Sequence, residues 1–297
     1  MSTAYMRSAW LVLCLTLCVF GGSVMCSAAD SPSATPGPLT LVVMDPLALP
    51  LSCPCVKGYA QRDYTQLASA LETKLGRKVK LVFNESLTSA LNGDAEGKVD
   101  LIIGKHSVVL FDGERSKLAL TPVAMLSGKD GSTTQTGLIV VPKDDPAQNV
   151  ADLKDYRMIF GPQESAEKHA AALALLKKHQ VSPPQELETS AACDEGACLI
   201  LELGPKVRGC ALISSYAKPL LEGCGTIKKG DLRVVGETEP VPFVGAFVNA
   251  TVSSADRAKI LVALVESTAD PRLQVALETK RGFLPIDKPL AETAKKK

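Results

Sequence analysis

Charged and hydroxyl side chains stand at the ends of two apolar runs that this sequence predicts to be strands. Lys105 and His106 come just after residues 99–103 (VDLII). Because ligands of α/β proteins are commonly bound at the carboxyl ends of parallel strands, both side chains are candidate ligand contacts. The alternative is that they are solvated loop residues. The matching strand end in the second half of the chain holds Ser214, Ser215 and Tyr216.

A polar turn precedes the apolar run at residues 137–141 (GLIVV). Its hydroxyls and amides have the donors and acceptors to hold an oxyanion or another polar ligand. An ordinary solvated turn is the alternative. The candidate ligand-binding residues of this turn are Ser132, Thr133, Thr134 and Gln135.

Ser165 and His169 belong to residues 164–179 (ESAEKHAAALALLKKH), whose Ala-rich composition predicts one long helix. At i, i+4 spacing these two side chains share one face of that helix. They are therefore candidates for a ligand pocket. The alternative is a surface histidine on a solvated helix.

The sequence Cys53-Pro54-Cys55 is the least ordinary feature of the chain. Two thiolates one residue apart can bind a soft metal such as copper or zinc, with His106 or His169 as further ligands. No CxxC or HxxxH pair is present to complete a strong metal signature. The sequence therefore favours the alternative, in which both cysteines form disulfides.

Residues 1–29 have the pattern of a signal peptide, with Arg7 before an apolar stretch at 9–20 (AWLVLCLTLCVF) and small residues before the cleavage point. The apolar stretch is too short to span a bilayer comfortably. Lipid anchoring would use Cys26, but Met25 stands where a small residue is normally required. We therefore expect a periplasmic or otherwise exported protein with a cleaved signal, rather than a lipoprotein or a retained anchor.

Removal of this segment takes three of the nine cysteines with it. The others would enter an oxidising compartment, where an even number favours disulfides. The sequence cannot choose among the pairings. The disulfide candidates are Cys53, Cys55, Cys193, Cys198, Cys210 and Cys224.

The charge of the chain is nearly balanced, with 33 basic and 32 acidic side chains. This balance argues against nucleic acid as a partner, because no basic surplus is available to neutralise phosphates. The one tryptophan, Trp10, lies in the signal segment, so stacking on a sugar is a poor prospect. The chain has no Gly-x-Ser-x-Gly, HExxH or P-loop motif. We therefore expect neither an enzyme nor a bound cofactor.

Strand and helix signals alternate along the chain, and the series restarts after about residue 130. Such alternation predicts parallel strands with helices on both faces of a sheet. We expect an α/β fold of two lobes, each a mostly parallel sheet flanked by helices, with the site in the cleft between them. The expected boundaries are a signal at 1–29, a linker at 30–38, lobe 1 at 39–130, lobe 2 at 131–240, and a return to lobe 1 with a basic tail at 241–297.

Five segments of the chain, in this order, carry a resemblance to a known family. They are KLGRKVKLVF (74–83), GKVDLIIG (97–104), DGSTTQTGLIVVPKDDP (130–146), VADLKDYRMIFG (150–161) and GFLPID (282–287). Together they resemble the periplasmic substrate-binding proteins of phosphate, phosphite and phosphonate ABC importers. The resemblance implies the type 2 bilobed binding fold, a small polar or anionic ligand, and an ABC permease as partner. Contact with a membrane would come only through the permease or a lipid anchor.

One departure from this family concerns the anion site. The family usually opens a helix with a Ser-Thr-Ser-Gly motif that holds phosphonate oxygens at the helix N-terminus. Here only Ser165 remains, and Glu164 and Glu167 would repel a dianion. We expect an exported binding protein that closes two lobes over a small anion. The alternative is an accessory redox or metal-binding protein that uses Cys53 and Cys55.

Overall fold

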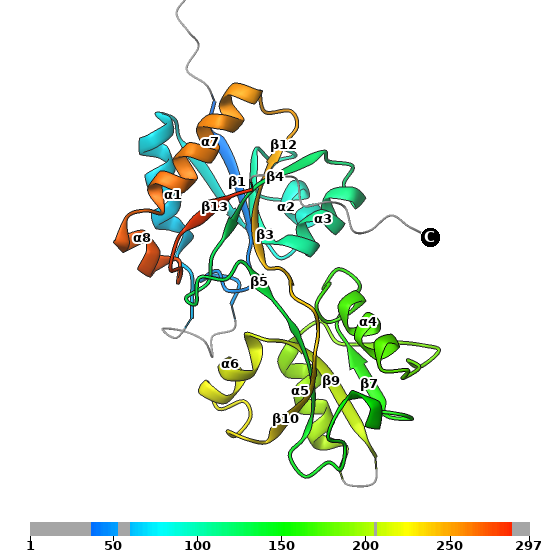
Figure 1. The fold of residues 1–297 in the computed structure, drawn as a ribbon. Coiled ribbons are helices and arrows are strands. Elements are labelled where there is room, and N and C mark those ends of the chain that lie inside the picture. Colours follow the sequence, from blue (N-terminus) through cyan, green and yellow to red (C-terminus); the bar gives the residue numbers. More distant parts are fainter. Residues whose placement is uncertain (1–36, 53–59, 205–206, 287–297) are drawn as a thin grey trace, which may run out of the picture. The chain divides into compact units, whose positions relative to one another are not determined.

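The computed structural model describes residues 37–52, 60–204 and 207–286. The expected signal peptide, most of the expected linker, and Cys53 and Cys55 lie outside these residues. None of the helices in these ranges is both long and apolar enough to cross a bilayer. Two β-sheets, each with helices packed on its faces, organise residues 37–286 into two lobes (Figure 1).

The first lobe is built on a six-stranded sheet of order β13-β4-β12-β3-β1-β2. Every side chain of β1 is buried, because helices cover both faces of the sheet. Strands β1, β2 and β3 are parallel, whereas β12 is antiparallel to both β3 and β4. The strands are β1 (Leu39–Met44), β2 (Val79–Phe83), β3 (Leu101–Lys105), β4 (Leu120–Leu126), β12 (Val244–Asn249) and β13 (Phe283–Pro285).

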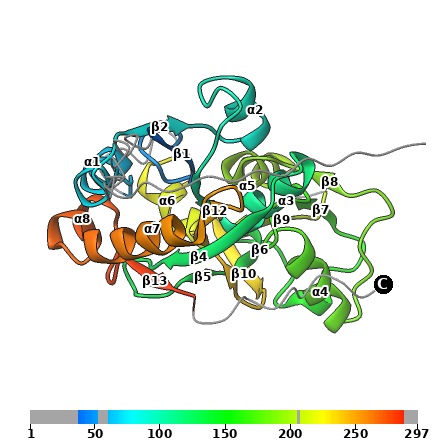
Figure 2. The ribbon, with the colours of Figure 1, turned by 90° about the horizontal axis from the view of Figure 1, so that it is seen from above.

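The helices of the first lobe divide between the two faces of this sheet. Helix α1 (Tyr64–Leu75) packs with α7 (Ser254–Ser267) on one face, with α8 (Pro271–Ala276) beside them (Figure 2). Helices α2 (Leu87–Asn92) and α3 (His106–Arg115) cover the other face. Helix α1 begins at the Asp63 cap, whose carboxylate accepts from the Thr65 amide, and ends where Gly76 adopts φ +63°.

The second lobe is built on a five-stranded sheet of order β10-β6-β9-β7-β8. Helix α4 (Ala170–Lys178) packs on one face, and α5 (Cys193–Glu202) with α6 (Ala217–Gly223) lies on the other; the 3₁₀ helix η2 (Val150–Asp152) joins β6 to β7. The strands are β6 (Gly137–Pro142), β7 (Arg157–Phe160), β8 (Glu188–Thr189), β9 (Gly209–Ser214) and β10 (Leu232–Glu237).

The two-lobed α/β fold agrees with the prediction, but each sheet is mixed rather than mostly parallel. The parallel set of the second sheet is β8-β7-β9, and β6 runs antiparallel to β9 and β10. The antiparallel strands β6 and β12 each follow a segment in which the chain changes lobe. It does so at residues 127–136 and 238–243, and the strands β5 (Thr134–Gln135) and β11 (Val241–Pro242) pair within these crossings.

The long helix expected at 164–179 is shorter, because α4 begins only at Ala170. Residues 162–169 form turns instead, with the Ser165 amide donating to the Pro162 carbonyl at 2.9 Å. The Glu167 carbonyl contacts the backbone of Gly137, where a Cβ atom would collide with it. Glycine at this position therefore allows the loop between β7 and α4 to lie against the start of β6.

Candidate ligand-binding site

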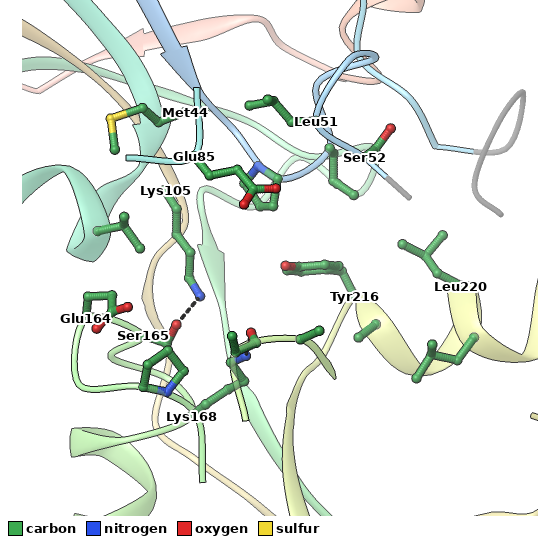
Figure 3. A pocket seen from close by; sticks show the side chains of 18 residues that line it. Met44, Leu51, Ser52, Glu85, Lys105, Glu164, Ser165, Lys168, Tyr216 and Leu220 are labelled. Atoms are coloured by element: carbon green, nitrogen blue, oxygen red, sulfur yellow. Dashed lines mark hydrogen bonds between the residues drawn. The ribbon is translucent and has the colours of Figure 1, made fainter. Parts of the chain in front are cut away.

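A cavity of about 400 Å³ lies at the carboxyl ends of strands from both sheets (Figure 3). Met44 at the end of β1 and Lys105 at the end of β3 line it from the first lobe. The loop at 162–168 and Tyr216, which precedes α6, line it from the second lobe. This is the place at which α/β proteins of this topology commonly bind ligands.

Lys105 connects the two lobes inside this cavity. Its side chain is 7% exposed, and its Nζ lies 2.6 Å from Glu167 Oε1. The same ammonium donates to Ser165 Oγ at 3.1 Å, the bond drawn as a dashed line in Figure 3. Since Lys105 belongs to the first sheet and both partners to the loop after β7, these contacts hold the lobes together through a charge-assisted pair.

Glu167 is fully buried beside the cavity. Its Oε1 accepts from Lys105 and also from the Ser214 hydroxyl, which lies 2.6 Å away. Its Oε2 has no hydrogen-bond partner among the residues described here. The carboxylate therefore neutralises Lys105 at the point where the lobes meet.

Lys168 is a second buried cation of the cavity, with 3% of its surface exposed. Its Nζ donates to the Ala191 carbonyl at 3.2 Å. Its aliphatic stem crosses Gly161, where a Cβ atom would collide with it. Within the described ranges no carboxylate forms an ion pair with this ammonium.

Ser107, in the first turn of α3, makes a second contact between the lobes. Its hydroxyl donates to the Glu164 carbonyl at 2.7 Å and accepts from the Ala166 amide at 3.3 Å. Both partners belong to the loop after β7. The hydroxyl therefore satisfies two backbone groups of that loop from the opposite lobe.

A buried polar cluster supports the wall of the cavity near β1. Asp45 is fully buried and accepts from Arg62 Nη1 at 2.9 Å and from the Tyr64 hydroxyl at 2.6 Å. Burial and the Asp45 carboxylate raise the pKa of the Tyr64 phenol well above its usual value. The Arg62 guanidinium lies 5.3 Å from the centroid of Phe243, which itself stacks on Tyr216 at 5.1 Å.

Over residues 59–288 the sequence matches a family described as "ABC transporter, phosphonate, periplasmic substrate-binding protein". The chain belongs to this family. Its members are periplasmic proteins that bind substrates for transport. The two lobes found here agree with the two-lobed fold of such proteins. No curated protein sequence matches the chain at a significant level.

Several solved structures share the fold of this binding protein. A Xanthomonas citri protein bound to ATP has a TM-score of 0.62 at 16% identity, covering 85% of this chain and 92% of its own. A binding-protein component of a phosphonate ABC transporter from Pseudomonas aeruginosa has a TM-score of 0.62 at 15% identity over 84% and 82%. PhnD1 from Prochlorococcus marinus, in complex with methylphosphonate, has a TM-score of 0.60 at 11% identity over 85% and 93%.

The structure brings together four of the side chains that the sequence nominates for this binding protein. Lys105, Ser165 and Tyr216 line the cavity, and Ser214 lies behind it on Glu167. All four stand at strand ends or in the loop that follows one. Lys168 is a lining residue that the sequence did not predict, because a lysine within the expected helix at 164–179 has no feature that marks it as a ligand contact.

The two candidate histidines lie away from the cavity lining. The His106 ring packs against Phe247 with centroids 5.2 Å apart, and burial lowers its pKa to about 4. The His169 Nδ1 lies 2.9 Å from the Gly161 carbonyl, and the ring meets Phe160 edge-on. Neither imidazole is among the residues that line the cavity, and their role as ligand contacts stays a prediction.

The predicted polar turn of the binding protein also lies outside the cavity lining. The hydroxyls of Ser132 and Thr134 are 3.0 Å apart and bond within the turn. The Thr133 carbonyl accepts from the Phe243 amide at 3.0 Å, and Gln135 is a buried residue of β5. Ser215 bonds Thr136 through both its amide and its hydroxyl. These residues hold the crossing between lobes instead of contacting the cavity.

Among the expected disulfide cysteines, Cys210 is fully buried in β9 and is a free thiol. The expectation of a disulfide at this residue is therefore wrong, because the side chain points into the core beneath α4. Burial raises the pKa of this thiol to about 12. The described part of the chain holds no cluster of His, Cys, Asp and Glu suited to a metal ion. The other pairings stay predictions.

Proposed function

We propose that this binding protein is exported, captures a small anion in the cavity between its lobes, and delivers it to the permease of an ABC importer. The observation that carries the proposal is the pair of buried lysines, Lys105 and Lys168, which approach one cavity from different lobes. A buried ammonium is costly unless an opposite charge or hydrogen bonds compensate it. Glu167 compensates Lys105, whereas Lys168 donates to a carbonyl, so an anion that enters the cavity would supply the opposite charge that Lys168 needs.

Lobe closure is the mechanism that fits this arrangement. The contacts of Lys105 and Ser107 with the loop after β7 join the lobes directly. The chain crosses between lobes only at 127–136 and 238–243 within residues 60–204 and 207–286, so hinge motion would be confined to these segments. A ligand that touches both sides stabilises the closed arrangement by its differential affinity for it.

Phosphonate, phosphite and phosphate are the first ligands to test, since the family is described by phosphonate transport. The mature protein, beginning at residue 30, would be titrated in a thermal-shift assay with phosphate, phosphite, methylphosphonate and a set of monocarboxylates. At least one anion is expected to raise the melting temperature, because a ligand that binds only the folded state stabilises it. If none of these anions shifts the melting temperature, anion capture is excluded.

Export can be tested on the full chain. Expressed in a Gram-negative host, the protein is expected in the periplasmic fraction, with a mature N-terminus at Asp30 by mass spectrometry. A full-length protein that stays in the cytoplasm would contradict this part of the proposal.

A further inference from the structure

The two cavity lysines differ in their electrostatic state. Glu167 lies 2.6 Å from Lys105 and neutralises it. Within the described ranges, the Lys168 ammonium donates its hydrogen bond to the Ala191 carbonyl and forms no ion pair. Both side chains are buried. A buried cation with a carbonyl as its partner is poorly compensated. Lys168 is therefore the cation at which a ligand's negative charge is best received.

A second negative charge on the ligand would meet an unfavourable field. Two lysines reach the cavity, and three carboxylates lie in or beside its wall: Glu85, Glu164 and Glu167. The Glu167 carboxylate is already paired with Lys105 at 2.6 Å, so Lys105 does not offset a second negative charge on the ligand. Like charges at such a site disfavour the doubly ionised form of a ligand.

The rest of the cavity wall is largely apolar. Side chains from both lobes contribute, with the ends of β1 and α6 on facing sides (Figure 3). A hydrated inorganic anion gains nothing from such a surface, while a hydrocarbon body is removed from water by it. The apolar wall includes Met44, Leu47, Leu51, Val108, Leu220 and Leu221.

We infer that the preferred ligand is an apolar monocarboxylate, with its carboxylate on Lys168 and its hydrocarbon body against the leucines that follow β1 and those of α6. This inference rests on the proposed capture of an anion in the cavity. It assigns the substrate class. Because Glu167 already neutralises Lys105, the cavity favours a ligand with a single negative charge, placed on Lys168. Ser165 also lines the cavity on the side of Lys168, and Lys105 stays bound to Glu167.

Isothermal titration of the mature protein distinguishes the substrate classes. The probes are hexanoate, phenylacetate, methylphosphonate, phosphate, and the neutral amides hexanamide and phenylacetamide. Hexanoate or phenylacetate is expected to bind about tenfold or more tightly than its own amide, because the amide lacks the negative charge that Lys168 would receive. It is also expected to bind about tenfold or more tightly than methylphosphonate, which has only one methyl group to bury against the apolar wall. Tighter binding of methylphosphonate or phosphate overturns the inference but leaves the proposed function intact. Absence of binding by every probe overturns both.

Lys168→Met tests the head-group contact while keeping the aliphatic stem over Gly161. This variant is expected to lose about tenfold or more in affinity for the monocarboxylate, given the worth of a charged hydrogen bond. The matched control is Lys178→Met, which removes an exposed lysine of α4 and should bind as the parent does. Equal affinity of Lys168→Met and the control would contradict the assignment.

Glu167→Gln tests the charge limit. Without this carboxylate the positive charge of Lys105 is no longer offset by Glu167, so the preference should shift toward methylphosphonate by about tenfold. An unchanged preference in the folded variant contradicts the role given to Glu167.

Should this buried substitution prevent folding, Leu221→Ala tests the apolar wall of the same cavity. It should weaken hexanoate several-fold and leave acetate unaffected, and equal losses for both would contradict the apolar subsite.

Discussion

At the scale of single residues, the surroundings of each charge decide its role. Lys105 has a buried carboxylate 2.6 Å away, so its ammonium joins the lobes. Lys168 has a carbonyl instead, so its charge is left for a ligand. The sequence predicts Lys105 from its place at a strand end. It could not predict the partner, because Glu167 is 62 residues away and belongs to the other lobe.

His106 gives a pH-dependent prediction at this scale. Burial lowers the pKa of its imidazole from 6.5 to about 4. Below pH 6.5 the unfolded chain therefore takes up a proton here that the folded chain does not take up until about pH 4. The free energy of unfolding should fall across this window by an amount on the order of 3 kcal/mol.

The measurement is urea denaturation at pH 7 and pH 4.5 for the parent and for His106→Leu. The variant cannot titrate at this position and should lose less stability on acidification. Equal losses in both proteins would show that the imidazole is protonated in the folded state.

At the scale of elements, apolar periodicity predicts most strands and helices correctly, because it reports burial directly. The apolar run at 137–141 forms β6 as expected, and the run at 99–103 overlaps β3. The same reasoning failed at 164–169. Helix propensity favours a helix there, but contacts with Lys105 and with the backbone of Gly137 hold these residues as turns. Such long-range contacts leave no local signal in the sequence.

Gly137→Ala tests this explanation. The added methyl group would collide with the Glu167 carbonyl, and we expect a loss of about 2 kcal/mol in the free energy of unfolding together with weaker ligand binding. Gly37→Ala is the matched control, since no atom lies within 4 Å of its added Cβ. Chemical denaturation of both variants measures the difference. Comparable stability of the two would mean that the loop does not depend on this close approach.

At the scale of the whole described body, few contacts hold the lobes together in the cavity. The Ser107 hydroxyl supplies two of them, to the Glu164 carbonyl and the Ala166 amide. Opening would transfer these groups to water at modest cost, since exchange with water offsets most of a hydrogen bond. The free energy of ligand binding is therefore large enough to shift the equilibrium between open and closed lobes.

Ser107→Ala should shift the protein toward open arrangements. The radius of gyration of the ligand-free variant in X-ray scattering is expected to rise, and ligand affinity to fall several-fold. Ser69→Ala on the exposed face of α1 is the control, because its hydroxyl bonds only within that helix. A variant that scatters as the control does would assign lobe closure to other contacts.

The stack of Tyr216 on Phe243 offers a position for a fluorescent probe of ligand binding. Tyr216 borders the cavity, and Phe243 ends the second crossing, with ring centroids 5.1 Å apart. Residues 30–297 contain no tryptophan, so Phe243→Trp in a protein of these residues would install a single indole between the binding site and the hinge. Its emission should change as ligand enters, and an unresponsive signal would show that the stack is undisturbed. One substitution would thus turn the protein into a fluorescent sensor of its own occupancy.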